Sequence, residues 1–77
     1  MHIENLVKMA NQIGQFFEAE PDQDQAVKDI ASHIKRFWDP RMRTAIIAHV
    51  DQGGAGLLDI VARTIKTQRE LLQPAQK

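Results

Sequence analysis

Cysteine is absent from the 77 residues of this chain. Its absence excludes disulfide bonds, cysteine-ligated zinc, iron–sulfur clusters and thiol catalysis. It also fits a reducing compartment. No apolar segment approaches the roughly 20 residues that a membrane-spanning helix requires, and the N-terminal region lacks the apolar run of a signal peptide. We therefore expect a cytoplasmic protein with no membrane anchor of its own.

Residue patterns that support catalysis or metal binding are scarce as well. The histidines His2, His33 and His49 form neither a His-x-x-x-His nor a Glu-x-x-His pattern, so the sequence indicates no helix-borne metal site. No serine or threonine lies in the context of a nucleophile elbow. We predict that the protein is not an enzyme by itself and that it holds no cofactor or metal.

The formal net charge is zero, but the charges are unevenly distributed. Residues 1–29 carry two lysines against six carboxylates, a net charge of −4. Residues 30–50 carry four basic residues against a single carboxylate, a net charge of +3. A neutral chain with an acidic first third argues against general nucleic-acid binding. The distribution favours a protein that docks on its partner in one orientation.

Apolar residues recur at spacings of three and four, which is typical of amphipathic helices. Proline at positions 21 and 40, and three glycines between positions 53 and 56, interrupt this pattern,. No segment alternates with the period of two that is typical of a strand. We predict an all-α fold, a single domain over residues 1–77 built as a small bundle of about four short helices. The predicted helices span residues 3–17, 23–37, 40–50 and 57–72, and residues 73–77 form a flexible tail.

Gly14 lies on the apolar face of the first predicted helix. A glycine costs about 1 kcal/mol relative to alanine inside a helix. Its presence therefore marks either a close crossing with another helix or a position where the cost is tolerated.

The segment of residues 34–43 holds the only tryptophan and four of the ten basic residues. Asp39 is predicted to cap the third helix, with Pro40 at its first position. We expect Phe37 to pack in the core, whereas Trp38 and the arginines form either an interface or a solvated surface. Tryptophan and arginine are the residue types most enriched at interface hot spots. The predicted partner-binding residues are Arg36, Trp38, Arg41, Met42 and Arg43.

The glycine-rich turn before the fourth predicted helix allows a second interpretation. Backbone amides at a helix N-terminus can bind phosphate. This turn lacks the lysine and hydroxyl of a P-loop, and no strand precedes it, so a simple connection between helices is the first interpretation. The alternative hypothesis assigns phosphate or nucleotide contacts to Arg41, Arg43, Gly53 and Gly54.

An ordered set of motifs resembles one small family, the delta subunit of the NAD-dependent, molybdenum-containing formate dehydrogenases of bacteria. The resemblance extends from about Leu6 to about Ile65. The motifs that carry it are LVKMANQI at residues 6–13, FF at 16–17, HIKRFWDPRMR at 33–43 and GGAGL at 53–57.

The resemblance implies a small accessory subunit of a cytoplasmic complex that oxidises formate to carbon dioxide and reduces NAD. In such complexes the molybdenum–bis-guanine dinucleotide, the iron–sulfur clusters and FMN belong to larger subunits. The delta subunit is associated with assembly, stability or cofactor maturation of the large subunit. The family assigns no catalytic residue to this subunit, so none is transferred to this chain.

Three functional hypotheses follow. The leading one is a non-catalytic accessory subunit that docks on the molybdenum-bearing subunit through the segment from Trp38 to Arg43. The second is a maturation factor that binds the guanine-nucleotide part of the cofactor, with Trp38 stacked on the base. The third is a helix-turn-helix regulator, against which the neutral charge argues. In the absence of a partner, a homodimer is expected through leftover apolar residues, namely Met9, Phe16, Leu58 and Leu71.

Overall fold

A computed structural model describes residues 2–74, which form five helices and no strand. The helices are α1 (Ile3–Phe17), α2 (Gln23–Phe37), α3 (Pro40–Asp51), α4 (Asp59–Thr67) and the single-turn α5 (Arg69–Leu72). The prediction of a small all-α bundle is confirmed. Residues 75–77 of the predicted tail lie outside the described residues.

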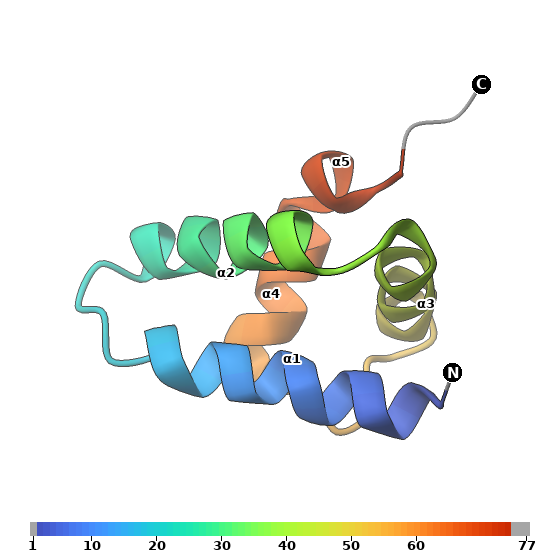
Figure 1. Cartoon of the computed structure of the whole chain (residues 1–77). Helices are drawn as coiled ribbons and strands as arrows, with labels where there is room; N and C mark the ends of the chain where they lie inside the picture. The colour runs from blue at the N-terminus through green and yellow to red at the C-terminus, as the bar shows by residue number, and fades with distance from the viewer. Residues whose placement is uncertain (1, 75–77) are drawn as a thin grey trace.

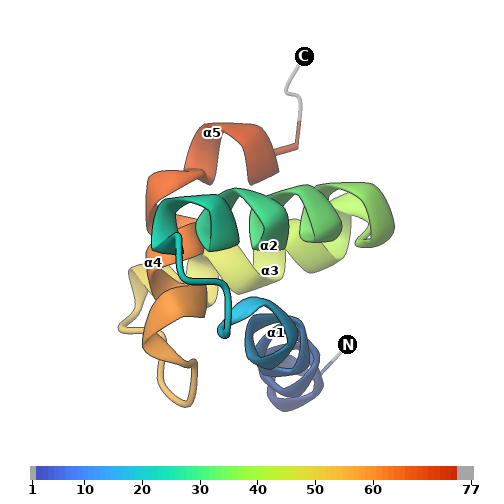
Figure 2. The same cartoon turned by 90° about the vertical axis from the view of Figure 1, so that its left-hand side faces the viewer.

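Helices α1 and α2 lie side by side, and α3 crosses near the C-terminal end of α2 (Figure 1). Helix α4 packs behind this pair and contacts both of them, while α5 lies along the outer side of α2. Figure 2 shows that α4 covers one side of the α1–α2 pair, whereas none of the helices within the described residues covers the other side. None of the helices within residues 2–74 is long and apolar enough to cross a membrane.

The core lies between α1, α2, α3 and α4, and α2 contributes to it along most of its length. The apolar residues of α2 between positions 26 and 34 are all buried, namely Ala26, Val27, Ile30, Ala31 and Ile34. The largest side chains that are fully buried come from α2, α3, α4 and α5: Ile30, Ile34, Ile46, Val61, Thr64, Ile65 and Leu72.

Aspartates begin both α2 and α3. The Asp22 carboxylate accepts a hydrogen bond from the backbone amide of Gln25 at 3.1 Å. The Asp39 carboxylate accepts one from the backbone amide of Met42 at 3.0 Å. Each bond satisfies one of the amides left free at a helix N-terminus. Pro40 follows Asp39 at the start of α3. The predicted cap at Asp39 is confirmed.

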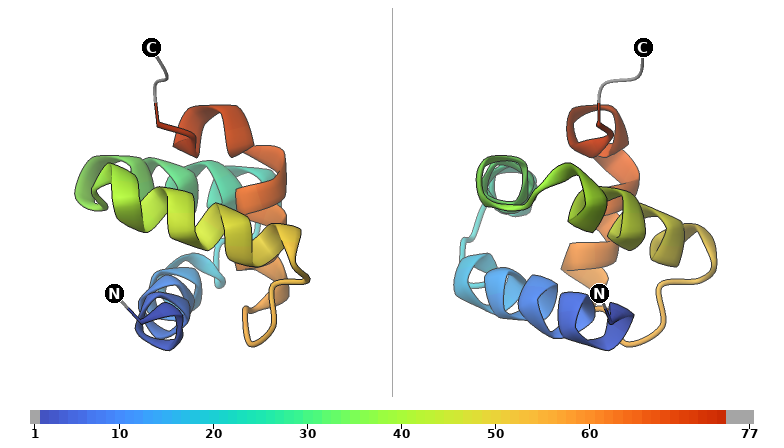
Figure 3. Two further views of the ribbon diagram at one scale, coloured as in Figure 1. Left: turned by 90° about the vertical axis from the view of Figure 1, so that its right-hand side faces the viewer. Right: turned by 45° about the vertical axis from the view of Figure 1, so that its right-hand side comes forward.

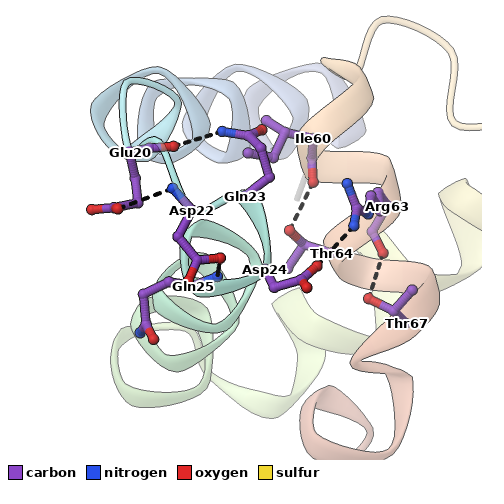
Figure 4. Close-up of polar contacts among 9 residues, drawn as sticks. All are labelled: Glu20, Asp22, Gln23, Asp24, Gln25, Ile60, Arg63, Thr64 and Thr67. Carbon is purple, nitrogen blue, oxygen red and sulfur yellow. Dashed lines mark hydrogen bonds and ion pairs between the residues drawn. The ribbon is translucent and has the colours of Figure 1, made fainter.

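The predicted fourth helix is shorter than expected and is broken near its end. The chain leaves helical geometry at Gln68 (φ −105°, ψ 25°), between α4 and α5. The Thr64 and Thr67 hydroxyls donate to the carbonyls one turn earlier, those of Ile60 and Arg63, at 2.7 and 2.8 Å (Figure 4). Such bonds compete with the helical pattern and bend helices. The break places Leu72 in the core.

Polar contacts near the start of α2 link it to α4 and to the preceding turn. The Arg63 guanidinium lies 3.0 Å from the Asp24 carboxylate, across the junction of α4 and α2 (Figure 4). The Gln23 side-chain amide donates to the Glu20 carbonyl at 2.7 Å. These side chains are exposed, so each contact contributes little stability.

Candidate functional site

A largely apolar groove opens between α1, the C-terminal half of α2 and the start of α3. Its volume is about 560 Å³. We call it the α1–α2 groove. Only a glutamine and a histidine interrupt its apolar lining, which consists of Met9, Gln12, Ile13, Phe16, Phe17, His33, Phe37, Trp38 and Met42.

The orientation of α1 explains why the groove is uncovered. Gly14 is buried against α4, where an added Cβ would meet Val61. Phe16 follows two residues later, and at 100° per residue it points to nearly the opposite side of the helix. Phe16 is therefore 79% exposed. Met9 and Phe16, which line the groove, thus lie on the side of α1 away from Gly14 and α4,.

Aromatic rings line the groove in series. Phe16 and Phe17 meet edge to face with ring centroids 4.9 Å apart, and the Phe17 and His33 centroids are 6.4 Å apart. His33 in turn lies 4.7 Å from Phe37 on the next turn of α2. These distances are typical of attractive aromatic pairs. The series joins the end of α1 to the end of α2 as one aromatic surface.

The structure reverses the expected positions of Phe37 and Trp38. Phe37 is 68% exposed, so its predicted place in the core is wrong. As the last residue of α2, it lies one turn after His33 and shares that residue's direction toward the groove. Trp38 leaves the helix in an extended conformation (φ −93°, ψ 134°), with its amide bonded to the Ile34 carbonyl. That change of direction turns its side chain inward, and only 5% of it is exposed.

The arginines of the same segment divide into an inner and an outer set. Arg43 is only 8% exposed, and its Nη1 donates to the Leu72 carbonyl at 3.1 Å, while its Nε has no hydrogen-bond partner among residues 2–74. Arg43 therefore joins α3 to α5. Arg36 and Arg41 are exposed and form no ion pair with any residue that the structure describes. Met42 is half-buried beside them.

The burial of Arg43 could have been found in the sequence. Residues 43, 46, 47 and 50 follow the three- and four-residue spacing of one helix face, and the other three are apolar. This spacing places Arg43 on the inner face of α3. The burial of Arg43 was not predicted because arginine is rarely buried.

The glycine turn forms the end of α3 and not the start of α4. Gly53 and Gly54 have positive φ angles of 115° and 66°, and their amides donate to the Val50 and His49 carbonyls at 3.0 and 2.9 Å. Glycine is favoured where a helix ends in this left-handed geometry. The prediction of a phosphate contact at Gly53 and Gly54 gains no support, because both amides are already hydrogen-bonded.

Asn11 fixes this connection to α1. Its side-chain amide donates to the Gly56 carbonyl, and its oxygen accepts from the Leu58 amide, each at 2.9 Å. Figure 3 shows the α3–α4 connection descending from α3 to the level of α1. No role for Asn11 was predicted from the sequence, although its position next to the fully buried Ala10 was an available signal.

The described residues contain no group of three or more histidine and carboxylate side chains that could hold a metal ion.

The family model of the NADH-dependent formate dehydrogenase delta subunit, FdsD, matches residues 5–65. The chain belongs to the FdsD family. The resemblance seen in the sequence is thereby confirmed. No curated protein and no solved structure matches the chain. The FdsD match includes all the residues that line the α1–α2 groove and ends before α5.

Proposed function

We propose that this FdsD-family chain is a non-catalytic accessory subunit of a cytoplasmic, NAD-dependent formate dehydrogenase. It would assist assembly, stability or molybdenum-cofactor maturation of the large subunit. The observation that carries this proposal is the α1–α2 groove with its exposed phenylalanines. Contiguous exposed apolar surface on a small domain is typical of an interaction site.

The size of the chain supports the same proposal. A domain of this length buries only about 60% of the surface of its unfolded chain, so its stability alone is marginal. Binding to a partner stabilises the folded state by mass action. A small subunit of this kind gains stability from the complex and contributes binding surface to it.

The proposed docking surface is the α1–α2 groove and its rim. Of the five partner-binding residues predicted from the sequence, Arg36 and Arg41 are exposed and Met42 lines the groove. Trp38 and Arg43 are buried, so we assign them the role of holding the corner between α2 and α3 in place.

Removal of the chain tests the proposal. The other subunits of the complex are expressed with and without it, and formate oxidation, molybdenum content and thermal stability are measured. A lower molybdenum content without the chain indicates cofactor maturation. Normal molybdenum content with a lower melting temperature indicates a role in assembly and stability. Equal values of all three quantities in both preparations would contradict an accessory role.

The alternative hypotheses receive less support from the geometry. Trp38 is buried and cannot stack on a guanine base without rearrangement, and the glycine amides are engaged. Titration calorimetry with GMP and GDP tests the nucleotide hypothesis, and an absence of heat counts against it. In the helix-turn-helix hypothesis, burial removes Arg43 from the residues that could contact DNA.

A further inference from the structure

We propose that the α1–α2 groove binds one amphipathic helix of another subunit, and that carboxylates on this helix pair with Arg36 and Arg41. The inference rests on the proposed function, because the helix belongs to a subunit of the same complex. Beyond the proposed function, it specifies the secondary structure, the polarity and the charge of the partner segment that the groove recognises.

The shape and polarity of the groove favour a helix. Met9 and Phe16 from α1 stand on one wall, and Phe37 from α2 stands on the other, all exposed. Met9 and Phe16 are seven residues apart, or about 10 Å along the helix axis. A partner helix of about two turns fits this length, with apolar residues at spacings of three, four and seven that enter the groove. It would cover both phenylalanines at once.

The rim of the groove favours carboxylates on that helix. The Arg36 guanidinium lies 5.8 Å from the centre of the Phe37 ring, at the edge of the groove. Arg41 is in the first turn of α3, next to Met42 of the groove lining. Arginine pairs strongly with carboxylates, often through two hydrogen bonds. Opposite charges across an interface guide the partner and fix its orientation.

The nearby carboxylates of the chain itself are already engaged. Asp29 accepts from the Gln25 side chain at 2.9 Å, and Asp39 accepts from the Met42 amide. Neither forms an ion pair in the part of the chain that the structure describes. The two arginines of the rim thus remain available to an acidic partner.

A second copy of the chain fits this surface less well. In a dimer with two-fold symmetry the same patch of each copy meets. Arg36 and Arg41 of both copies would then lie in one interface, while the nearby Asp29 and Asp39 of each copy already accept hydrogen bonds within that copy. Charge complementarity therefore favours a different chain as the occupant.

Photo-crosslinking in the assembled complex identifies the occupant. Benzoylphenylalanine is introduced at Phe16 or Phe37, and at Leu71 as a control, since Leu71 is an exposed apolar residue that does not line the groove. We expect positions 16 and 37 to crosslink to one segment of another subunit, with apolar residues at helical spacing and with Asp or Glu. We expect position 71 not to reach that segment. A crosslink to a second copy, to a segment without this pattern, or to nothing in an intact complex would overturn the proposal.

Affinity measurements separate this inference from the proposed function. We expect Phe16→Ser and the double variant Arg36→Glu/Arg41→Glu each to weaken binding to the purified remaining subunits by about tenfold or more. Leu71→Ser should change binding by less than about twofold. All these side chains are exposed, and unchanged thermal unfolding of each variant verifies its fold. If the wild-type chain binds and the groove variants bind equally well, the groove proposal fails and the accessory role stands. If the wild-type chain itself does not bind, the accessory role fails as well.

Discussion

Replacing Gly14 with alanine should destabilise the protein, although the same change inside an ordinary helix is stabilising. Alanine is favoured over glycine in a helix by about 1 kcal/mol. At this position the added Cβ would lie closer than 3.0 Å to Val61 Cγ2 and 3.5 Å from Leu58 Cδ1. Val61 is fully buried and β-branched, so its side chain has few alternative rotamers,. Overpacking of this kind costs about 1–3 kcal/mol. The expected net loss in the free energy of unfolding is therefore about 1 kcal/mol.

A double-mutant cycle with Val61→Ala tests the cause of this loss. Unfolding in urea is followed by the fluorescence of Trp38, the single and buried tryptophan. Val61→Ala removes the methyl group that the new Cβ would meet. In that background Gly14→Ala should raise the free energy of unfolding by up to about 1 kcal/mol. The sign of the effect should thus reverse between the two backgrounds.

Two results would refute this reasoning. One is a stabilising effect of Gly14→Ala in the wild-type background. The other is the same change in free energy in both backgrounds, because coupling through Val61 would then be absent.

Three further predictions follow from single contacts. Asn11→Ala should lower the free energy of unfolding by about 1 kcal/mol, since it leaves the partly buried Leu58 amide without its acceptor, while water can bond the exposed Gly56 carbonyl,; a urea titration that shows no loss would contradict the role of Asn11. Hydrogen bonding from Arg69, at 2.5 and 2.8 Å, lowers the pKa of the Asp51 carboxyl. The resulting stability is present above the unfolded-state pKa and is lost as the pH falls through the lower folded-state pKa. Asp51→Asn should therefore lower the urea midpoint at pH 7, and its difference from the wild type should vanish well below a pH of about 3.9. Arg43→Ala should lower the urea midpoint in the same assay, because it leaves a cavity and removes the donor of the buried Leu72 carbonyl, whereas Arg43→Met fills the space and should cost less,.

The sequence predicted most of the fold because its helix signals are local. The bounds of α1 and α2 agree with the prediction, since the apolar spacing, Pro21 and the Asp39-Pro40 pair act on the chain nearest to them. The third helix was predicted to within about a residue for the same reason. Of the two explanations left open for Gly14, the structure shows the close crossing, with α4 as the other helix.

What the sequence did not predict depends on contacts between distant segments. The break at Gln68 accompanies the packing of Leu72 into the core, which periodicity alone does not reveal. Phe37 and Trp38 are adjacent aromatic residues, and only the change of backbone direction at the end of α2 decides which is buried. The groove itself was not predicted, because a helical pattern identifies an apolar face but not whether another helix covers it.

The burial of Trp38 makes Trp38→Ala unsuitable as a probe of docking. Removal of a buried tryptophan costs about 3–5 kcal/mol, a large share of the stability of a small domain. Loss of the partner in that variant would report unfolding. Variants at Phe16, Arg36 and Arg41 avoid this difficulty, because their side chains are exposed.

The two hydrogen bonds of Asn11 have a consequence for synthesis on the ribosome. They join α1 to backbone groups 45 and 47 residues further along the chain. Gly14 likewise packs against Val61, which emerges late. Contacts between such distant residues form only after the intervening chain is closed into a loop. Helix α1 can pack against α2 and α3 as these helices emerge, but Gly14 and Asn11 gain their partners only when α4 and the connection before it have been made. During that interval the nascent chain exposes this side of α1, together with Phe16 of the groove, to chaperones and to any partner subunit nearby.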